Sequence, residues 1–299
     1  MTTKSQSYDI LIRTRTPFND IFVIERENLR EMWFQGRGRF YLQSRMDIDR
    51  PDDLALIYTR LLLASLLLNP EPARILMIGL GGGSLPRFLQ GEYPKLEIDV
   101  VEVDSRVIEL ARRYFDFSEN PRLRVHPGDG RAFVKQRSGE YDMVFLDAFK
   151  SGSVPYHLKT VEFYREIAQS LKEDGLLTTN LYGKSNRLKP RDRKTLESVF
   201  RRILFFEDPG RVATVCVAAL QEGGAPGELR QNAAALPEKV QRNLSWLDNM
   251  DMIDAGNAIP PGGSVFQDDF EASEFFKAVR RNNRNSPLGD PLYPIRNSI

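Results

Sequence analysis

Glycines and a carboxylate are spaced in this chain as a nucleoside ligand would require. The apolar run 75–78 is followed by a glycine-rich turn, and a second apolar run ends in an acid about twenty residues later. These residues are Gly79, Gly81, Gly82, Gly83 and Glu102. Glycines let the backbone pass close to a ligand, and the acid suits a pair of ribose hydroxyls. The pattern predicts a nucleoside cofactor site, with a purely structural turn as the alternative.

Two further carboxylates follow predicted strands. Asp129 and Gly130 come after a strand and open a helix. Asp129 is therefore expected either to cap that helix only, or to cap it and accept a hydrogen bond from an exocyclic amine as well. Asp147 ends the apolar run YDMVFLD and is expected to emerge beside the glycine turn, partly desolvated. That position suits a general base, and a solvated aspartate at a strand end is the alternative.

Strands and helices alternate along the middle of the chain and must position these residues. Strands are predicted near 75–79, 97–103, 122–126, 141–147 and 175–181, and helices near 84–90, 105–115, 130–137 and 160–172. This order predicts an α/β fold with a mostly parallel sheet. Two strands within 200–220, joined at Asp208, Pro209 and Gly210, predict an antiparallel last strand. Such an ending is typical of Rossmann-like, methyltransferase-type sheets.

The ends of the chain have a different character from its middle. Short alternating runs over 8–43 predict antiparallel β-hairpins. We therefore expect a small β-rich subdomain over 1–50 and a Rossmann-like catalytic domain over 51–299, with a C-terminal extension from about 221. Three finer predictions are a helix capped by Pro51, Asp52 and Asp53, a loop from Gln221 to Leu236, and a helix near Pro237–Met250.

Composition excludes several functions. With 299 residues, 41% hydrophobic, and a net charge of +1, the chain is predicted to be a globular protein with no basic field for nucleic acid. The apolar stretch Leu54–Leu68 is too short to cross a bilayer, and MTTKSQS is no signal peptide, so we expect a cytoplasmic location and no membrane partner. Cys216, His126 and His157 form no cluster with metal-ligand spacing, and Cys216 is predicted to be core.

The order of these motifs resembles the spermidine synthase family of polyamine aminopropyltransferases, as a divergent, spermidine synthase-like member. The match covers roughly residues 40–182 and consists of IGLGGG, VEVDSRVIELARRYF, LRVHPGDGRAFV, YDMVFLDAF and PYHLKTVEFYREIAQSLKEDGLL. The resemblance implies a dimeric transferase of polyamine biosynthesis with a β-stranded N-terminal domain. Its donor would be decarboxylated S-adenosylmethionine, whose aminopropyl group passes to an amine and leaves methylthioadenosine, with no metal. By resemblance, Glu102 binds the ribose, Asp129 and Gly130 hold the adenine, Gln43 lies near the sulfur, and Asp147 deprotonates the attacking amine.

Three positions depart from the family pattern. The family's turn carries an aspartate that faces the donor's amino group, and Gly82 stands there, which makes intact S-adenosylmethionine a plausible donor. The family's second acid, three residues after the base, is Lys150, whose charge would repel a diamine if it faces the pocket. A His-Glu pair before the turn is replaced by Thr59 and Arg60. The expected acceptor is therefore an amine other than plain putrescine.

Two segments beyond these motifs carry open questions. Loop 148–158, AFKSGSVPYHL, has the composition of a mobile gate over a site. Within it, Tyr156 and His157 either meet substrate or only pack the loop against the helix at 160–172. The segment FQDDF, with Asp268 and Asp269, resembles an acidic segment near the family's C-terminus and has no assigned role.

Three functions follow from this pattern: aminopropyl transfer, methyl transfer from S-adenosylmethionine, and a catalytically silent nucleoside-binding or assembly module. The first is preferred, because the β-rich N-terminus and Gln43 belong to the spermidine synthase family more than to methyltransferases at large.

Overall fold

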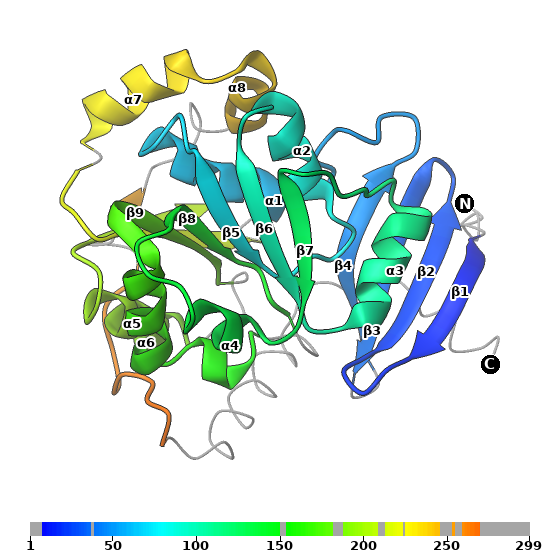
Figure 1. Cartoon of the computed structure of the whole chain (residues 1–299), viewed down its shortest axis with the longest axis horizontal. Helices are drawn as coiled ribbons and strands as arrows, with labels where there is room; N and C mark the ends of the chain where they lie inside the picture. Colours follow the sequence, from blue (N-terminus) through cyan, green and yellow to red (C-terminus); the bar gives the residue numbers. More distant parts are fainter. Residues whose placement is uncertain are drawn as a thin grey trace, which may run out of the picture.

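Two β-sheets of different construction make up the framework of the molecule (Figure 1). The computed structural model describes residues 8–36, 39–149, 154–181, 188–208, 213–223, 225–245, 253–254 and 259–269. The predicted turn at Pro209 and Gly210, and Lys150, lie outside the described residues.

The first sheet is antiparallel and joins consecutive strands in the order β1-β2-β3-β4. Its members are β1 (Asp9–Arg15), β2 (Asp20–Arg26), β3 (Leu29–Gly36) and β4 (Arg39–Asp47). Along β2, Ile21 and Val23 join one apolar cluster while Phe22 and Ile24 join another, because successive strand residues point to opposite faces. The predicted N-terminal hairpins are confirmed.

The second sheet has the order β12-β10-β11-β9-β8-β5-β6-β7. Its strands are β5 (Arg74–Ile78), β6 (Glu97–Glu102), β7 (Leu123–Pro127), β8 (Tyr141–Leu146), β9 (Leu171–Asn180), β10 (Arg202–Glu207), β11 (Thr214–Ala219) and β12 (Ile253–Asp254). The pairs among β5–β9 are parallel, and β11 is antiparallel to both β9 and β10. This confirms the methyltransferase-type sheet. The strand order reverses beside β5, where open α/β sheets bind ligands at their carboxyl edge.

Helices cover both faces of this sheet (Figure 1). One face carries α1 (Ile57–Leu62), η1 (Leu63–Leu67), α2 (Ser84–Glu92), α7 (Pro226–Ala235) and α8 (Glu238–Leu244). The other carries α4 (Gly130–Val134), η2 (Tyr156–Leu158), α5 (Val161–Ser170) and α6 (Lys189–Glu197).

Helix α3 (Ser105–Tyr114) joins the two sheets. Its residues Ile108 and Ala111 belong to the core of the large sheet. Val107 and Leu110 instead pack with side chains of the N-terminal sheet. This double contact holds the N-terminal sheet against the carboxyl edge of β6.

Several element boundaries differ from the sequence predictions. Residues 50–53 form a turn closed by a hydrogen bond from the Asp53 N–H to the Arg50 carbonyl, and α1 begins only at Ile57 without a side-chain cap. The prediction that Pro51, Asp52 and Asp53 cap this helix is wrong. Pro226–Ala235 is a helix and not a loop; it begins at a proline, which is tolerated in a first turn. Helix α5 ends at Ser170 because β9 begins at Leu171.

Helix α6 was not anticipated, because its sequence KPRDRKTLE lacks an apolar period. It buries charged groups in ion pairs instead, with Lys189 bonded to Glu207 and Asp192 to Lys159. Cys216 is fully buried in β11, as predicted. Within the described part of the chain, every helix is too short or too polar to cross a membrane.

Candidate active site

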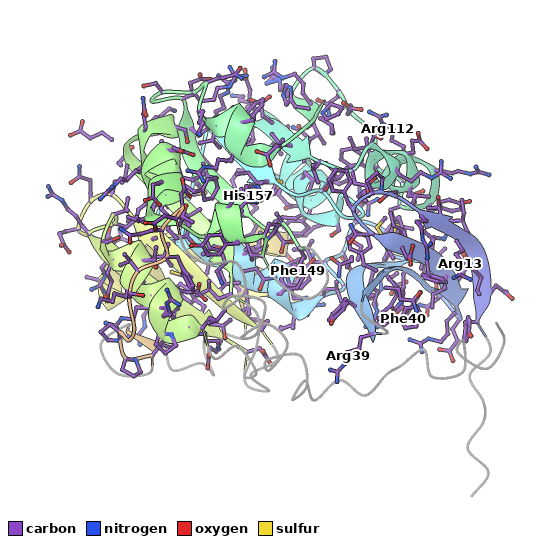
Figure 2. The ribbon with its side chains drawn as sticks, turned by 90° about the horizontal axis from the view of Figure 1, so that it is seen from below. Arg13, Arg39, Phe40, Arg112, Phe149 and His157 are labelled. Carbon is purple, nitrogen blue, oxygen red and sulfur yellow. The ribbon has the colours of Figure 1, made fainter. Side chains whose placement is uncertain are left out.

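A cavity of about 690 Å³ lies where the carboxyl edge of the large sheet meets the N-terminal sheet. The glycine turn after β5, the ends of β6 and β8, and residues of β4 all contribute to its wall. In Figure 2 the labelled Phe149 and His157 lie near the centre of the molecule, while Arg13 and Phe40 mark the N-terminal sheet. Most of the predicted nucleoside-site and base residues therefore line one cavity: Gln43, Gly79, Gly81, Glu102, Asp129, Gly130 and Asp147. Gly82 and Gly83 are not among its lining residues.

Gly79 allows Asp147 to lie directly beside the turn. It has a φ of +104°, and a Cβ there would lie 2.5 Å from the Asp147 carbonyl oxygen. The backbone N–H of Asp147 donates to the Ile78 carbonyl at 3.0 Å, so the ends of β5 and β8 stay in register. Only a residue without a side chain fits this close approach in this conformation. Gly81, with a φ of +56°, continues the turn and lines the cavity.

Gly82 and Gly83 serve the packing of the turn. The Gly82 N–H donates to Ser44 Oγ at 2.7 Å, and a Cβ there would lie 2.9 Å from the Phe115 ring. A Cβ on Gly83 would overlap the ring of Phe117. An aspartate at position 82 would therefore need Phe115 or Ser44 to shift.

Glu102 is buried at the end of β6 and borders the cavity. Its Oε2 accepts from the Leu80 N–H and its Oε1 from the Asp104 N–H, both at 2.9 Å. Burial raises the pKa of Glu102 above its usual value, although these backbone hydrogen bonds oppose the shift. Each carboxylate oxygen keeps further lone-pair capacity for a ligand hydroxyl.

Asp129 caps α4, because its Oδ1 accepts from the Ala132 N–H at 2.9 Å. Its Oδ2 lies 3.0 Å from His157 Nε2. Burial works to raise the pKa of Asp129, but the hydrogen bonds from Ala132 and His157 hold it below the usual value. Gly130 follows, and a Cβ there would overlap Ile78, so only glycine lets α4 begin this close to β5. The predicted cap is confirmed, and the adenine contact stays a prediction.

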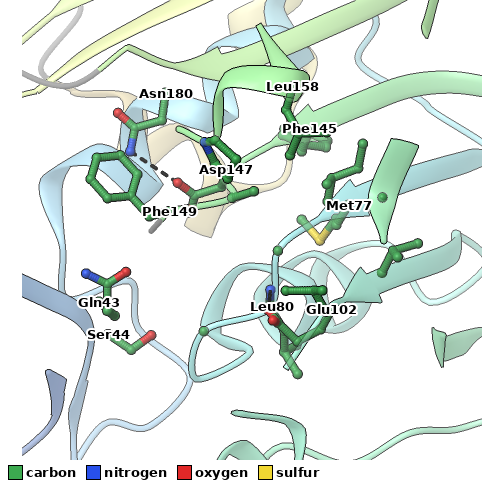
Figure 3. A pocket seen from close by; sticks show the side chains of 18 of the residues that line it. Gln43, Ser44, Met77, Leu80, Glu102, Phe145, Asp147, Phe149, Leu158 and Asn180 are labelled. Atoms are coloured by element: carbon green, nitrogen blue, oxygen red, sulfur yellow. Dashed lines mark hydrogen bonds between the residues drawn. The ribbon is translucent and has the colours of Figure 1, made fainter. Parts of the chain in front are cut away.

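Among the carboxylates of the described cavity wall, Asp147 has the pKa that is shifted furthest from its usual value. Part of its surface opens to the cavity and protein surrounds the rest, and this desolvation raises its pKa to about 7. Asn180 Nδ2 donates to Asp147 Oδ1 at 3.1 Å (Figure 3), and the Tyr58 hydroxyl lies near the carboxylate. Both groups oppose the rise in the pKa of Asp147. A carboxylate with this pKa is suited to accept a proton near neutral pH.

Gln43 lies across the cavity from Asp147 (Figure 3). The Tyr58 hydroxyl donates to the Gln43 carbonyl oxygen at 3.1 Å. Asn180 and Ser44 were missed from the sequence. Their signal was weak, because other polar residues flank each of them in its strand and neither stands in a recognisable motif.

Tyr156 and His157 both line the cavity, and a contact of either with substrate stays a prediction. The Tyr156 hydroxyl donates to the Gln267 carbonyl, and its ring meets Phe266 edge-on with centroids 6.1 Å apart. His157 pairs with Asp129. In the described part of the chain, no His, Cys, Asp and Glu side chains gather as a metal site would require.

Comparison with known proteins agrees with this geometry. Residues 56–223, more than half of the chain, match the family model of the spermine/spermidine synthase domain. The polyamine aminopropyltransferase of Vibrio vulnificus is 36% identical over 249 residues, 80% of this chain and 82% of that one. The eEF1A lysine and N-terminal methyltransferase of Mus musculus is 30% identical over 202 residues, 62% of this chain but 29% of that protein.

A solved structure adds to the evidence for the fold. That of a probable spermidine synthase from Corynebacterium glutamicum superposes with a TM-score of 0.66 at 20% identity, covering 85% of this chain and 97% of that one. The fold is of the Rossmann-like, methyltransferase type. The matching family model and the curated relatives make the chain a transferase. The chain belongs to the spermine/spermidine synthase family.

Proposed function

We propose that this transferase moves the aminopropyl group of decarboxylated S-adenosylmethionine to an amine acceptor, with Asp147 as the general base. The observation that carries the proposal is the desolvated Asp147 carboxylate beside the glycine turn, with its pKa raised to about 7. A protonated amine has a pKa near ~10 and no free lone pair, so it must lose a proton before it attacks.

The proposed step balances without a metal or a redox partner. Asp147 takes a proton from the acceptor ammonium, and the freed nitrogen lone pair forms a bond to the carbon next to the sulfonium. The bond between that carbon and sulfur breaks, and its electrons return to sulfur, which leaves as methylthioadenosine. Gln43, across the cavity from Asp147, is proposed to lie beside this sulfur.

The charges of the described cavity wall favour a cationic donor. Glu102, Asp129 and Asp147 contribute three carboxylates, and His157 is the remaining titratable group with a basic nitrogen. Decarboxylated S-adenosylmethionine carries a sulfonium and an ammonium and no carboxylate, so it complements this wall better than the intact form. Glu102 is proposed to hold the ribose and Asp129 with Gly130 the adenine.

Calorimetric titration with decarboxylated S-adenosylmethionine, S-adenosylmethionine and methylthioadenosine tests the donor before any acceptor is known. We expect the decarboxylated donor to bind at least tenfold more tightly than the intact one, about 1.4 kcal/mol. Release of methylthioadenosine with a panel of amines then tests the transfer itself. If none of the three nucleosides binds, a catalytically silent assembly module becomes the better account.

Methyl transfer is the second candidate, and Gly82 favours it. No aspartate stands at this turn position to repel the carboxylate of S-adenosylmethionine, and a Cβ at Gly82 would press on Phe115. The mouse relative named a methyltransferase supports the same reading. Equal or tighter binding of S-adenosylmethionine, with S-adenosylhomocysteine as the product, would establish this candidate in place of aminopropyl transfer.

The acceptor is proposed to be an amine other than plain putrescine. Lys150 stands where the family resemblance leads us to expect an acid, and Thr59 and Arg60 stand where it leads us to expect a His-Glu pair. A homodimer and a cytoplasmic location stay predictions; light scattering and cell fractionation would test them.

A further inference from the structure

Residues 259–269, which we call the C-terminal strap, run beside α5 and α6 (orange in Figure 1). Phe266 anchors the strap and is fully buried. Its N–H donates to Thr195 Oγ1 of α6 at 3.0 Å, and its carbonyl accepts from the Val161 N–H of α5 at 2.8 Å. These bonds fix the strap to two helices that are distant from it in sequence.

The strap contacts η2, although none of its residues lines the cavity. The Tyr156 ring rests edge-on against Phe266, and the Tyr156 hydroxyl donates to the carbonyl of Gln267. Within η2, the Leu158 and Lys159 N–H groups donate to the carbonyls of Pro155 and Tyr156 at 3.0 and 2.9 Å. The position of η2 therefore depends on the strap as well as on its own hydrogen bonds.

Arg131 connects the strap to the part of the cavity wall that contains Asp129 and Gly130, which we call the nucleoside end. Its Nη1 and Nη2 each donate to one carboxylate oxygen of Asp268 at 2.7 Å. The same guanidinium bonds both oxygens of Glu166 in α5 and donates to the His157 carbonyl at 3.2 Å. Planar, bidentate pairs of this kind fix orientation as well as charge.

Asp268 holds its side of this pairing firmly. Thr160 Oγ1 donates to Asp268 Oδ1 at 2.8 Å, and the Asp268 N–H donates to Glu162 Oε2 at 3.1 Å. The hydrogen bond from Arg131 lowers the pKa of Asp268 below its usual value, so the carboxylate is charged at neutral pH. Its neighbour Asp269 is exposed and makes no hydrogen bond or ion pair with the described residues.

We propose that Asp268 is a positioning residue for nucleoside binding, acting through Arg131 on His157 and Asp129. Arg131 follows directly after Asp129 and Gly130 in α4, and it holds the backbone of His157, whose ring meets Asp129 Oδ2 at 3.0 Å. Both His157 and Asp129 border the cavity, whereas Asp268 does not. The role rests on the proposed function, because it concerns the nucleoside that the cavity is proposed to bind.

The test compares Asp268→Asn with the matched control Asp269→Asn and the conservative variant Asp268→Glu. Two readouts are needed: calorimetric affinity for methylthioadenosine and S-adenosylhomocysteine, and hydrogen exchange at the amides of Leu158 and Lys159. We expect Asp268→Asn to weaken nucleoside binding about fivefold and to speed exchange at both amides. Asp269→Asn should match the unchanged protein, and Asp268→Glu should recover part of the loss because it keeps the charge.

The two readouts separate the failure of this role from the failure of the proposed function. If the unchanged protein binds neither nucleoside, the proposed function fails, while faster exchange in Asp268→Asn would still support the role of the strap in positioning η2. Unchanged exchange in Asp268→Asn overturns the inference whatever the binding result. Unchanged nucleoside affinity in a folded Asp268→Asn variant also overturns it. A loss of thermal stability without change in either readout would assign Asp268 a purely structural role.

Discussion

Asp147 and Asp129 both border the cavity, but their surroundings move their pKa values in opposite directions. Asp147 is desolvated, and the opposing effects of Asn180 and Tyr58 do not offset its burial, so its pKa rises to about 7. Asp129 receives a backbone N–H and faces His157, and its pKa falls below the usual value.

This difference suits the two carboxylates to the different tasks that we propose for them. A group that must gain and lose a proton works best with a pKa near the ambient pH, whereas a group that only binds should stay ionised. The part of the cavity wall around Asp147, which we call the base end, therefore keeps this carboxylate poorly solvated. This desolvation lowers the stability of the folded protein. The nucleoside end surrounds its carboxylate with donors and links it, through Arg131, to the C-terminal strap.

The largest expected effect removes the base. Asp147→Asn has nearly the same volume and keeps a partner for Asn180, but it cannot accept the proton of the acceptor. We expect the turnover rate to fall by about 10²- to 10⁴-fold, the range of general base catalysis, with little change in nucleoside affinity. Steady-state kinetics beside Asp174→Asn, an exposed aspartate in β9, measures the loss. A variant within threefold of the unchanged protein would exclude Asp147 as the base.

The same substitution is also expected to change how the free energy of unfolding depends on pH. Because the folded-state pKa of Asp147 lies above the unfolded value of about 4, the folded protein loses stability as pH rises from about 4 to 7. Asp147→Asn removes that penalty and is expected to be more stable than the unchanged protein above pH 7, by up to about 4 kcal/mol. Urea unfolding at pH 8 and pH 4.5 tests this. An equal difference at both pH values would contradict the raised pKa.

The glycine turn is the next way to disturb the base end. Gly79→Ala would place a Cβ 2.5 Å from the Asp147 carbonyl oxygen at a φ of +104°. We expect a loss of about 2 to 3 kcal/mol in unfolding free energy, together with reduced activity. Gly91→Ala in α2 is the matched control, because nothing lies within 4 Å of its added Cβ; it should stabilise by about 0.5 to 1 kcal/mol. Similar effects at both glycines would argue against the close approach.

The smallest expected effect lies at the nucleoside end. Asp129→Asn preserves the cap of α4, since asparagine caps as well as aspartate, but it removes the charge that faces His157. We expect methylthioadenosine affinity to fall about tenfold, near 1.4 kcal/mol, with the pH dependence of turnover unchanged. A shift in that pH dependence would mean that Asp129, and not only Asp147, carries the catalytic proton.

The sequence alone predicted the base end better than the support of the nucleoside end. Gly79 and Asp147 lie at the ends of apolar strands, so the alternation of strands and helices was enough to bring them together. The pairing of Arg131 with Asp268 joins residues 137 positions apart, and neither short-range period nor motif announces such a contact. The sequence did not predict helix α6 for a related reason: the helix buries Lys189 and Asp192 in ion pairs and has no apolar stripe.

Direct titration of the two carboxylates tests the central claim. Carbon-13 nuclear magnetic resonance of aspartate-labelled protein, with Asp147→Asn and Asp129→Asn to assign the signals, would give both pKa values in one experiment. We expect the Asp147 carboxyl to titrate near pH 7. The Asp129 carboxyl is expected to titrate at a pH below the usual pKa of an aspartate. If Asp147 instead titrates at or below about 4, the usual value for an aspartate, it is not poised as a base at neutral pH and the account fails.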